Sequence, residues 1–424
     1  MPLRGMVLEE VGATAHLAEQ PVFEAVRLAI PDEAIDAVIA EAGAQEQRRR
    51  LLPARLVVSL VIALSLWARD SVLDVLLNLV DGLREGDPGP WRAWHPPVKS
   101  ALSQARQRLG ARPLFLLFRR LARPVAPADL PGAYLCGLRL MAIDGTTLDL
   151  PDTPENADAF GRPSTKLKDG TRRLGPWPQV KLVWLAEVGT HVLCDVVIRP
   201  ATASEVPPAR RLLRSVEAGM LVLWDRGLHS YAQVRATRDR GAHVLGRIGA
   251  GVTLTPEEEL SDGSFLTTLY PSDRARRLGA DGLQVRVIEY TIDDPARPRP
   301  DERYRLVTSL LDPQEAPART LALAYHERWE IEIALDDVKV HQIDRRPAPH
   351  LRSRHPREVV QEIYGLALAH RAIRCLMTEA AARAHLDPDR LSFVGTLRIL
   401  RRAIPRHQRA LADPNATPFF STAS

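Results

Sequence analysis

The stretch from Tyr325 to Lys339, YHERWEIEIALDDVK, carries an aromatic hydroxyl, a guanidinium, carboxylates and one amine in a regular order. It has no Gly or Pro, and its Glu, Arg, Leu and Ala residues favour a helix. At about 100° per residue, Tyr325, Arg328, Glu332 and Lys339 fall within a stripe about 60° wide. A solvated helix laced with weak ion pairs would show similar letters. This stretch alone therefore does not decide between the wall of an active site and an ordinary surface.

Two further carboxylates follow short apolar runs that are typical of buried strands. Asp144 ends the run in CGLRLMAIDG, and Asp225 follows LVLW. If these strands are neighbours in a sheet, Asp144 and Asp225 emerge side by side, and a helix packed on the sheet could bring Glu332 opposite them. Asp-Gly and Asp-Arg-Gly are also good turn sequences. Either aspartate alone is better explained as a turn residue, so the prediction depends on the combination.

Three converging carboxylates repel one another unless a cation holds them together. Mg²⁺ and Mn²⁺ are hard divalent ions that prefer oxygen ligands. Two such ions about 4 Å apart can activate a water or a 3′-hydroxyl and stabilise the leaving oxygen of a phosphodiester. The carboxylates therefore predict phosphoryl transfer on nucleic acid.

The elements that must position these residues change in type along the chain. Residues 22 to 123 are predicted to be helical, and the arginine-rich pair of helices in residues 98–124 is either a DNA-reading pair or two core helices with solvated basic faces. From residue 136 the order is strand, strand, strand, helix, strand, helix, strand, which predicts a mixed sheet that begins as a meander and continues through helical crossovers. Residues 250–315 predict a β-rich insertion before the helix at 325–339.

Composition limits the class of protein without naming one. The 424 residues suffice for two or three domains, and a net charge of +5 with a pI of about 9.3 permits a polyanionic partner. Three widely spaced cysteines fit neither a disulfide framework nor a zinc cluster, so a reducing cytoplasm is the expectation. His326 and His341 lack zinc spacing. The apolar run at 56–67 is too short to span a bilayer and predicts a buried helix, and no secretory signal is evident.

The segments AIDGTTLDLPDTPENADAFG, LVLWDRGLHSYAQV and RYRLVTSLLDPQEAPARTLALAYHERWEIEIALDDVKVHQI resemble the DDE transposases of the bacterial insertion-sequence-four group. The hallmark of that group is Y-x2-R-x3-E-x6-K, met here at Tyr325, Arg328, Glu332 and Lys339, and the resemblance spans roughly residues 20 to 375. It implies an α/β, ribonuclease-H-like mixed sheet with a β-strand insertion, preceded by an all-helical N-terminal domain. It also implies that Asp144, Asp225 and Glu332 bind two Mg²⁺ ions, for which Mn²⁺ can substitute. Tyr325, Arg328 and Lys339 would contact DNA phosphates.

The resemblance further implies cut-and-paste transposition: cleavage at the element ends, a hairpin intermediate and strand transfer to target DNA, by a homodimer in the synaptic complex. The hairpin step commonly uses an aromatic residue to stack a flipped base. Residues 226–320 contain no Trp, so Tyr304 is the substitute candidate, with Tyr290 behind it; a core or cross-strand role is favoured for both.

Trp329 is assigned to helix packing. His229 and Arg226 flank Asp225 and either assist there or begin a helix. Four arginines that follow the signature are further DNA candidates: Arg345, Arg346, Arg352 and Arg354.

These expectations give five segments along the chain. They are a helical DNA-end-binding domain (1–130), the first part of the catalytic core (131–249), the β-rich insertion (250–315), the second part of the core with the signature helix (316–380) and a basic C-terminal segment (381–424). The protein would act in the bacterial cytoplasm, on the nucleoid when bound to DNA. Two other functions remain open: a transposase-derived DNA-binding protein without catalytic activity, and a ribonuclease-H-like nuclease that cleaves without strand transfer.

Overall fold

The structure is a computed structural model that describes residues 29–48, 50–86, 95–249, 251–292, 303–343 and 349–412. The chain forms two compact units, and each unit combines separate parts of the sequence. Unit 1 consists of Met1–Arg123, Asp149–Ala159 and Asp337–Ser424, and unit 2 consists of Pro124–Leu148 and Phe160–Asp336. Residues 337–380, which the sequence assigns to the second part of the catalytic core, lie in unit 1 with the N-terminal helices.

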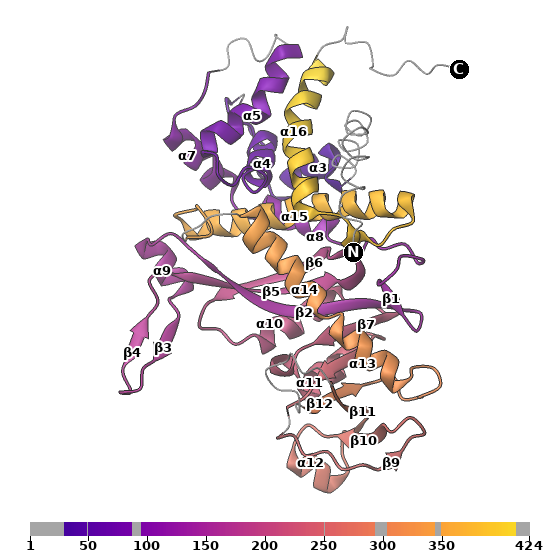
Figure 1. Cartoon of the computed structure of the whole chain (residues 1–424). Coiled ribbons are helices and arrows are strands. Elements are labelled where there is room, and N and C mark those ends of the chain that lie inside the picture. Colours follow the sequence, from indigo (N-terminus) through magenta and orange to yellow (C-terminus); the bar gives the residue numbers. More distant parts are fainter. Residues whose placement is uncertain are drawn as a thin grey trace, which may run out of the picture. The chain divides into compact units, whose positions relative to one another are not determined.

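Unit 1 is helical and is built around one long helix, α15 (Pro356–Ala384). This helix contacts α4 (Ala54–Ala63), α7 (Lys99–Leu109), α8 (Arg112–Leu121) and α16 (Phe393–Ala412). Figure 1 shows α16 beside α5 (Val72–Gly86), an arrangement that joins the C-terminal helix to the N-terminal region. The remaining elements are α3 (Asp32–Glu41), most of α9 (Pro154–Phe160), the π-helical turn η4 (Asp337–Gln342) and η5 (Pro388–Arg390).

The apolar run at 56–67 is buried except at the half-buried Ser59, and its part up to Ala63 is helical in α4, as predicted, whereas residues 64–67 form turns. Within the described residues, no helix is long and apolar enough to cross a membrane. The arginine-rich pair is α7 and α8, and Arg106 of α7 is buried. Its guanidinium donates to Ser353 Oγ at 2.9 Å and to the Glu358 carbonyl at 3.0 Å. For Arg106, the structure therefore favours the core-helix alternative over DNA reading.

Unit 2 is built on one ten-stranded sheet, whose central order is β6-β5-β2-β7-β8. The strands are β2 (Leu138–Asp149), β5 (Gln179–Glu187), β6 (Leu193–Pro200), β7 (Met220–Trp224) and β8 (His243–Arg247). β5 and β6 form an antiparallel hairpin, whereas β2, β7 and β8 are parallel neighbours. The meander and the helical crossovers predicted from the sequence are confirmed. A short strand, β1 (Tyr134–Leu135), pairs with the start of β2.

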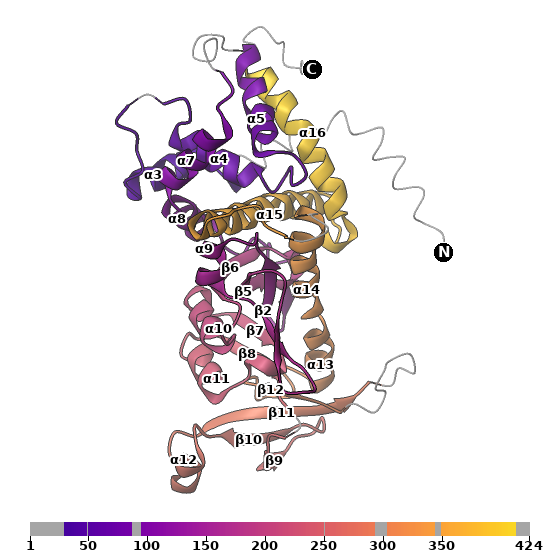
Figure 2. The same ribbon diagram turned by 90° about the vertical axis from the view of Figure 1, so that its left-hand side faces the viewer.

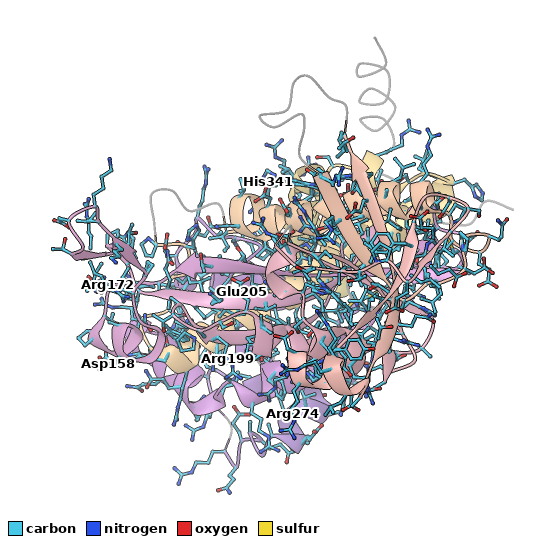
Figure 3. The ribbon with its side chains drawn as sticks, turned by 90° about the horizontal axis from the view of Figure 1, so that it is seen from below. Asp158, Arg172, Arg199, Glu205, Arg274 and His341 are labelled. Atoms are coloured by element: carbon cyan, nitrogen blue, oxygen red, sulfur yellow. The ribbon has the colours of Figure 1, made fainter. Side chains whose placement is uncertain are left out.

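The predicted β-rich insertion extends this sheet and does not form a separate body. β12 (Arg303–Thr308) pairs antiparallel with β8, and the order continues through β11 (Leu283–Thr291), β10 (Phe265–Leu269) and β9 (Glu258–Glu259). A helical turn, α12 (Asp273–Leu278), connects β10 to β11. A second small sheet, β3 (Ser164–Lys166) with β4 (Arg172–Leu174), forms a projecting hairpin that carries Arg172 (Figure 3).

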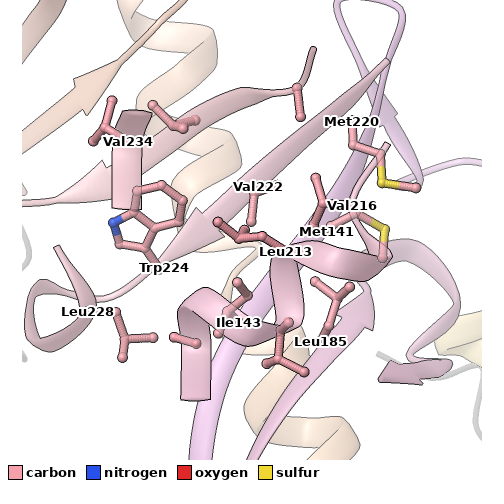
Figure 4. Close-up of a cluster of buried hydrophobic side chains, with 14 of the residues drawn as sticks. Met141, Ile143, Leu185, Leu213, Val216, Met220, Val222, Trp224, Leu228 and Val234 are labelled. Carbon is pink, nitrogen blue, oxygen red and sulfur yellow. The ribbon is translucent and has the colours of Figure 1, made fainter. Parts of the chain in front are cut away.

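Helices cover both faces of the sheet in unit 2. Figure 2 shows α10 (Val206–Leu212) and α11 (Tyr231–Arg238) on one face, with α13 (Ala318–His326) and α14 (Trp329–Asp336) on the other. The core under α10 and α11 includes Met141, Ile143, Val222 and Trp224 (Figure 4). Because side chains alternate along a strand, the residue after Ile143 points to the opposite face, toward α13 and α14.

Candidate active site

Asp144 and Asp225 are brought together by the register of two parallel strands. The paired part of β2 and β7 ends where Ile143 lies opposite Trp224. The next residue on each strand is an aspartate, and neighbouring strands are about 4.8 Å apart. Asp144 and Asp225 therefore lie side by side and on the same face, as expected from the sequence. The expected strand end at Asp144 is wrong, because β2 continues to Asp149, whereas β7 ends at Trp224.

The signature stretch is not the single helix that its letters predict. Helix α13 ends at His326, residues 327 and 328 form a turn, α14 begins at Trp329, and the chain widens into η4 at Asp337. The uniform angular stripe is therefore wrong as a description of Tyr325, Arg328, Glu332 and Lys339. Lys339 lies in unit 1, whereas the other three lie in unit 2.

The turn between α13 and α14 places Arg328 between two of the carboxylates. Its Nη1 donates to Asp144 Oδ2 at 3.2 Å, and its Nη2 donates to Glu332 Oε1 at 3.0 Å. The hydroxyl of Tyr325 donates to Asp225 Oδ1 at 3.4 Å. Tyr325 of α13 thus contacts Asp225, and Arg328 of the turn links Asp144 to Glu332 of α14.

These groups are unequally exposed. The side chain of Arg328 is 8% exposed, whereas those of Asp144 and Glu332 are 24% and 38% exposed. The carboxylates therefore remain accessible to a ligand, while the guanidinium that bridges them is held inside the unit. Arg328 also lies near two rings, 6.0 Å from the centroid of Tyr325 and 5.8 Å from that of Trp329.

The local electrostatics leave Asp144 short of positive charge. Burial raises the pKa of Asp144, and the carboxylates of Glu332 and Asp225 raise it further, while the Gly145 amide and Arg328 lower it. The Gly145 N–H donates to Asp144 Oδ1 at 2.7 Å. Burial also raises the pKa of Tyr325, so its hydroxyl is a neutral donor at physiological pH. One guanidinium faces three carboxylates, which is the charge balance expected of a cation site.

The donor set fits hard divalent ions. Three carboxylates from two strands and one helix supply only oxygen ligands, which suit Mg²⁺ or Mn²⁺ and not a thiolate-preferring metal. His229 does not compete for this role as a cation, because burial lowers its pKa to about 4. Its ring is neutral at physiological pH, and the start of the next helix is capped instead by Ser230, whose side chain accepts from the Gln233 N–H. Arg226, on the other side of Asp225, is exposed.

One carboxylate near this site was not foreseen. A Cβ added to Gly145 would lie 2.8 Å from Cδ of Glu205, which precedes α10. Glu205 also pairs with Lys181, whose Nζ is 3.4 Å from its Oε1. Gly145 thus allows the end of the Glu205 side chain, whose position is labelled in Figure 3, to approach its backbone closely. The Asp-Gly pair was the only sequence feature that could have pointed to this approach.

The aromatic candidates also separate into two kinds. Tyr304 is opposite Tyr290 in the β11 and β12 pair, stacks on it with ring centroids 5.3 Å apart and has Arg247 over its ring at 4.3 Å. This arrangement is the favoured cross-strand role. Trp329, assigned to helix packing from the sequence, is instead 55% exposed. The indole of Trp329 is therefore accessible to solvent and lies next to Arg328.

The arginines after the signature also differ in environment. Arg345 and Arg346 lie outside the described residues. Arg352 donates to the backbone carbonyls of Leu64 at 3.0 Å, Ala68 at 2.8 Å and Asp70 at 3.0 Å, so its guanidinium joins segments within unit 1. Arg354 is exposed. The geometry thus favours a structural role for Arg352 and leaves Arg354 free to face a solvent-borne ligand.

Comparison with known proteins gives two family matches that together cover most of the chain. Residues 23–119 match the family described as "Insertion element 4 transposase N-terminal", and residues 136–371 match the family described as "Transposase DDE domain". The chain is 31% identical over 387 residues to the transposase InsG for insertion sequence element IS4 of Escherichia coli (strain K12), over 89% of this chain and 82% of InsG.

Two further matches are more distant. InsZ of the same Escherichia coli strain is 29% identical over 216 residues, which are 50% of this chain and 67% of InsZ. A solved structure of piggyBac transposase in a synaptic complex with hairpin DNA aligns over 95% of this chain and 87% of that one, at 12% identity and a TM-score of 0.45.

Proposed function

Since this chain belongs to the insertion-element-4 family of DDE transposases, we propose that it cuts DNA at the ends of its insertion element and joins the freed 3′ ends to target DNA. The observation that supports this most directly is that Asp144 and Asp225 each follow the paired segment of the adjacent strands β2 and β7, with Arg328 linking Asp144 to Glu332. Asp144, Asp225 and Glu332 would hold two divalent ions, Mg²⁺ or Mn²⁺. When bound, such ions activate the attacking oxygen and stabilise the leaving oxygen of the phosphodiester.

The protein's own residues would orient the DNA around this centre. Arg328 presents a planar guanidinium that suits bidentate contact with a phosphate, and its present carboxylate partners hold it inside the site. Tyr325 remains a neutral donor, and its bond to Asp225 fixes the direction of that carboxylate. In unit 1, Lys339 and Arg354 would contact DNA phosphates as well. Arg345 and Arg346 are proposed for the same role from their sequence alone.

A cut-and-paste route through a hairpin needs the end of the duplex to be distorted. A flipped base would be stabilised by stacking on an aromatic ring. Trp329 is the better placed candidate because its indole is exposed beside Arg328. Tyr304 is the second candidate, since its ring already has Tyr290 and Arg247 against it.

The experiment that tests this function uses a labelled duplex carrying the element's own end, a target plasmid and Mg²⁺ or Mn²⁺. The expected products are a nicked end, a hairpin and an end joined to the plasmid. Binding of the end without any cutting in either metal would support the transposase-derived binding protein. Cutting without joined products would support a nuclease. A mixture of two differently labelled ends, recovered in one complex, would test the homodimer expected for synapsis.

A further inference from the structure

The signature leaves six positions between Glu332 and Lys339 unspecified, and one of them is a buried carboxylate. Asp337 is 4% exposed, whereas Asp336 beside it is exposed. Asp337 begins η4, a π-helical turn that ends at Gln342 and contains Lys339. Turns of this type are rare and occur mostly as single turns, frequently at functional sites. The geometry of this turn sets the direction in which Lys339 leaves the backbone.

The carboxylate of Asp337 contacts two side chains that lie one turn apart on α15, Arg374 and His370. Its Oδ2 accepts a hydrogen bond from Arg374 Nη2 and lies 3.9 Å from His370 Nε2. Phe393 of α16 packs over both partners, 5.6 Å from the His370 ring and 5.3 Å from the Arg374 guanidinium. Arg374 is 3% exposed and His370 is fully buried. All four residues belong to unit 1.

The far end of η4 is fixed to the same helix. Gln342 is fully buried, and its Nε2 donates to the Leu366 carbonyl at 3.0 Å. Val338 is also buried, at 2% exposure. Lys339 and Val340 are half-buried and His341, labelled in Figure 3, is exposed. The turn is therefore attached to α15 at both ends, with Lys339 between the attachments.

A buried ion pair is weak evidence for stability, because removing both charges from water costs about as much as their attraction returns. The best-attested use of such a pair is to fix a register. Two registers of η4 against α15 are conceivable, because either of the adjacent residues Asp336 and Asp337 could face Arg374. A slip by one residue would turn Asp336 inward and would rotate Lys339 away from its present direction.

We propose that Asp337 is a positioning residue: its buried pair with Arg374 selects the register of η4 and so directs Lys339 toward the DNA phosphate. This proposal rests on the proposed function for the role of Lys339, but not for the effect of Asp337 on the lysine itself. The two can therefore be tested separately.

The first test measures binding of the element's end duplex as a function of salt. Each lost phosphate contact lowers the salt slope by about 0.9. Asp337→Asn should lower the slope by this amount, as Lys339→Ala does, and adding Lys339→Ala to Asp337→Asn should lower it no further. Asp336→Asn is the matched control, because it makes the same chemical change one residue away at an exposed position, and it should keep the wild-type slope.

The second test needs no DNA. The rate at which an amine-reactive reagent labels Lys339 in the intact free protein, measured by mass spectrometry, should change in Asp337→Asn and stay unchanged in Asp336→Asn. If Asp337→Asn does not fold, the double variant Asp337→Leu with Arg374→Met removes the pair without leaving a buried charge unpaired. It should show the same change in labelling.

The outcomes separate the two proposals. Wild-type labelling of Lys339 and a wild-type salt slope in the Asp337 variants would overturn the positioning role. Altered labelling with no effect of Lys339→Ala on the slope would support the positioning of Lys339 and remove that lysine from the proposed DNA contacts.

Discussion

Two sets of carboxylates in this protein have opposite electrostatic surroundings. In unit 2, Asp144 and Glu332 share the single guanidinium of Arg328, remain partly exposed, and burial with mutual repulsion raises the pKa of Asp144. In unit 1, Asp337 is buried, and although burial raises its pKa, His370 and Arg374 outweigh this and lower it. The negative charge of the unit 2 carboxylates is only partly neutralised by the protein, whereas that of Asp337 is neutralised by its own protein partners.

This difference distinguishes a group that awaits a ligand from one that holds the fold. Functional sites are where repulsion and burial are left uncompensated, and such sites cost stability. A sequence shows the same letter, Asp, in both places. The distinction lies in the partners that tertiary structure brings, so substitutions at the two places should differ in kind.

The largest effect is expected from neutralising the unit 2 carboxylates. Asp144→Asn, Asp225→Asn and Glu332→Gln should each lower cleavage at least about 10³-fold, because a bound metal contributes several kcal/mol to the transition state and each 1.4 kcal/mol is about tenfold. Single-turnover cleavage of the labelled end measures this. Asp336→Asn should cut at the wild-type rate, and triad variants that bind the end and still cut normally would remove these residues from the chemistry.

Replacing the guanidinium that bridges the carboxylates should have a smaller effect. Arg328→Gln is expected to lower cleavage about 10- to 100-fold, since a hydrogen bond to a charged group contributes about 1.5–3 kcal/mol. Arg328→Lys should restore only part of the rate, because an ammonium lacks the two-pronged geometry. Full activity of the lysine variant would show that charge alone suffices there.

The exposed indole should affect one step only. Stacking contributes about 1–3 kcal/mol per base, so Trp329→Ala should reduce hairpin formation about 5- to 100-fold while the first nick proceeds normally. Trp329→Phe retains an aromatic face for stacking, so its rate of hairpin formation should lie between those of the wild type and Trp329→Ala. The same gel assay applied to Tyr304→Ala ranks the two candidates, and a larger loss in that variant would return the stacking role to Tyr304.

The smallest effects concern stability, and they should have opposite signs in the two units. Because the folded pKa of Asp144 is raised, its ionisation opposes folding at neutral pH. Asp144→Asn should therefore raise Tm in metal-free buffer, and the gain should vanish below the ordinary Asp pKa of about 3.9. The folded pKa of Asp337 is lowered, so its stabilisation is present above that value and is lost as pH falls through the folded pKa. Asp337→Asn should lower Tm at neutral pH. If calorimetry shows that both variants change Tm in the same direction, the two aspartates do not differ in the way described here.

Much of the fold followed from the sequence because its information was local. Apolar runs with turn residues gave the strands of unit 2, and the ribonuclease-H-like mixed sheet with its helical N-terminal region is confirmed. Of the candidate site, the sequence predicted that Asp144 and Asp225 lie side by side, because each is the first residue after the segment in which β2 pairs with β7.

The rest depended on tertiary contacts that local propensity does not contain. The residues around 327–328 favour a helix, so the turn there was not predicted from the sequence. The contacts of the buried Arg328 guanidinium with Asp144 and Glu332 stabilise this turn. The apolar face of α15 could have packed on either unit, and its partners α4 and α8 are distant in sequence. Exposure of Trp329 and the approach of Glu205 to Gly145 likewise follow only from the assembled unit.

The most direct test of this account is Mn²⁺ binding to the free protein, followed through the loss of the paramagnetic resonance signal of free Mn²⁺. The wild type and Asp337→Asn should take up Mn²⁺ alike, whereas Asp225→Asn should lose that uptake. Uptake by Asp225→Asn equal to that of the wild type, or uptake lost only in Asp337→Asn, would contradict the assignment of the cation site to Asp144, Asp225 and Glu332.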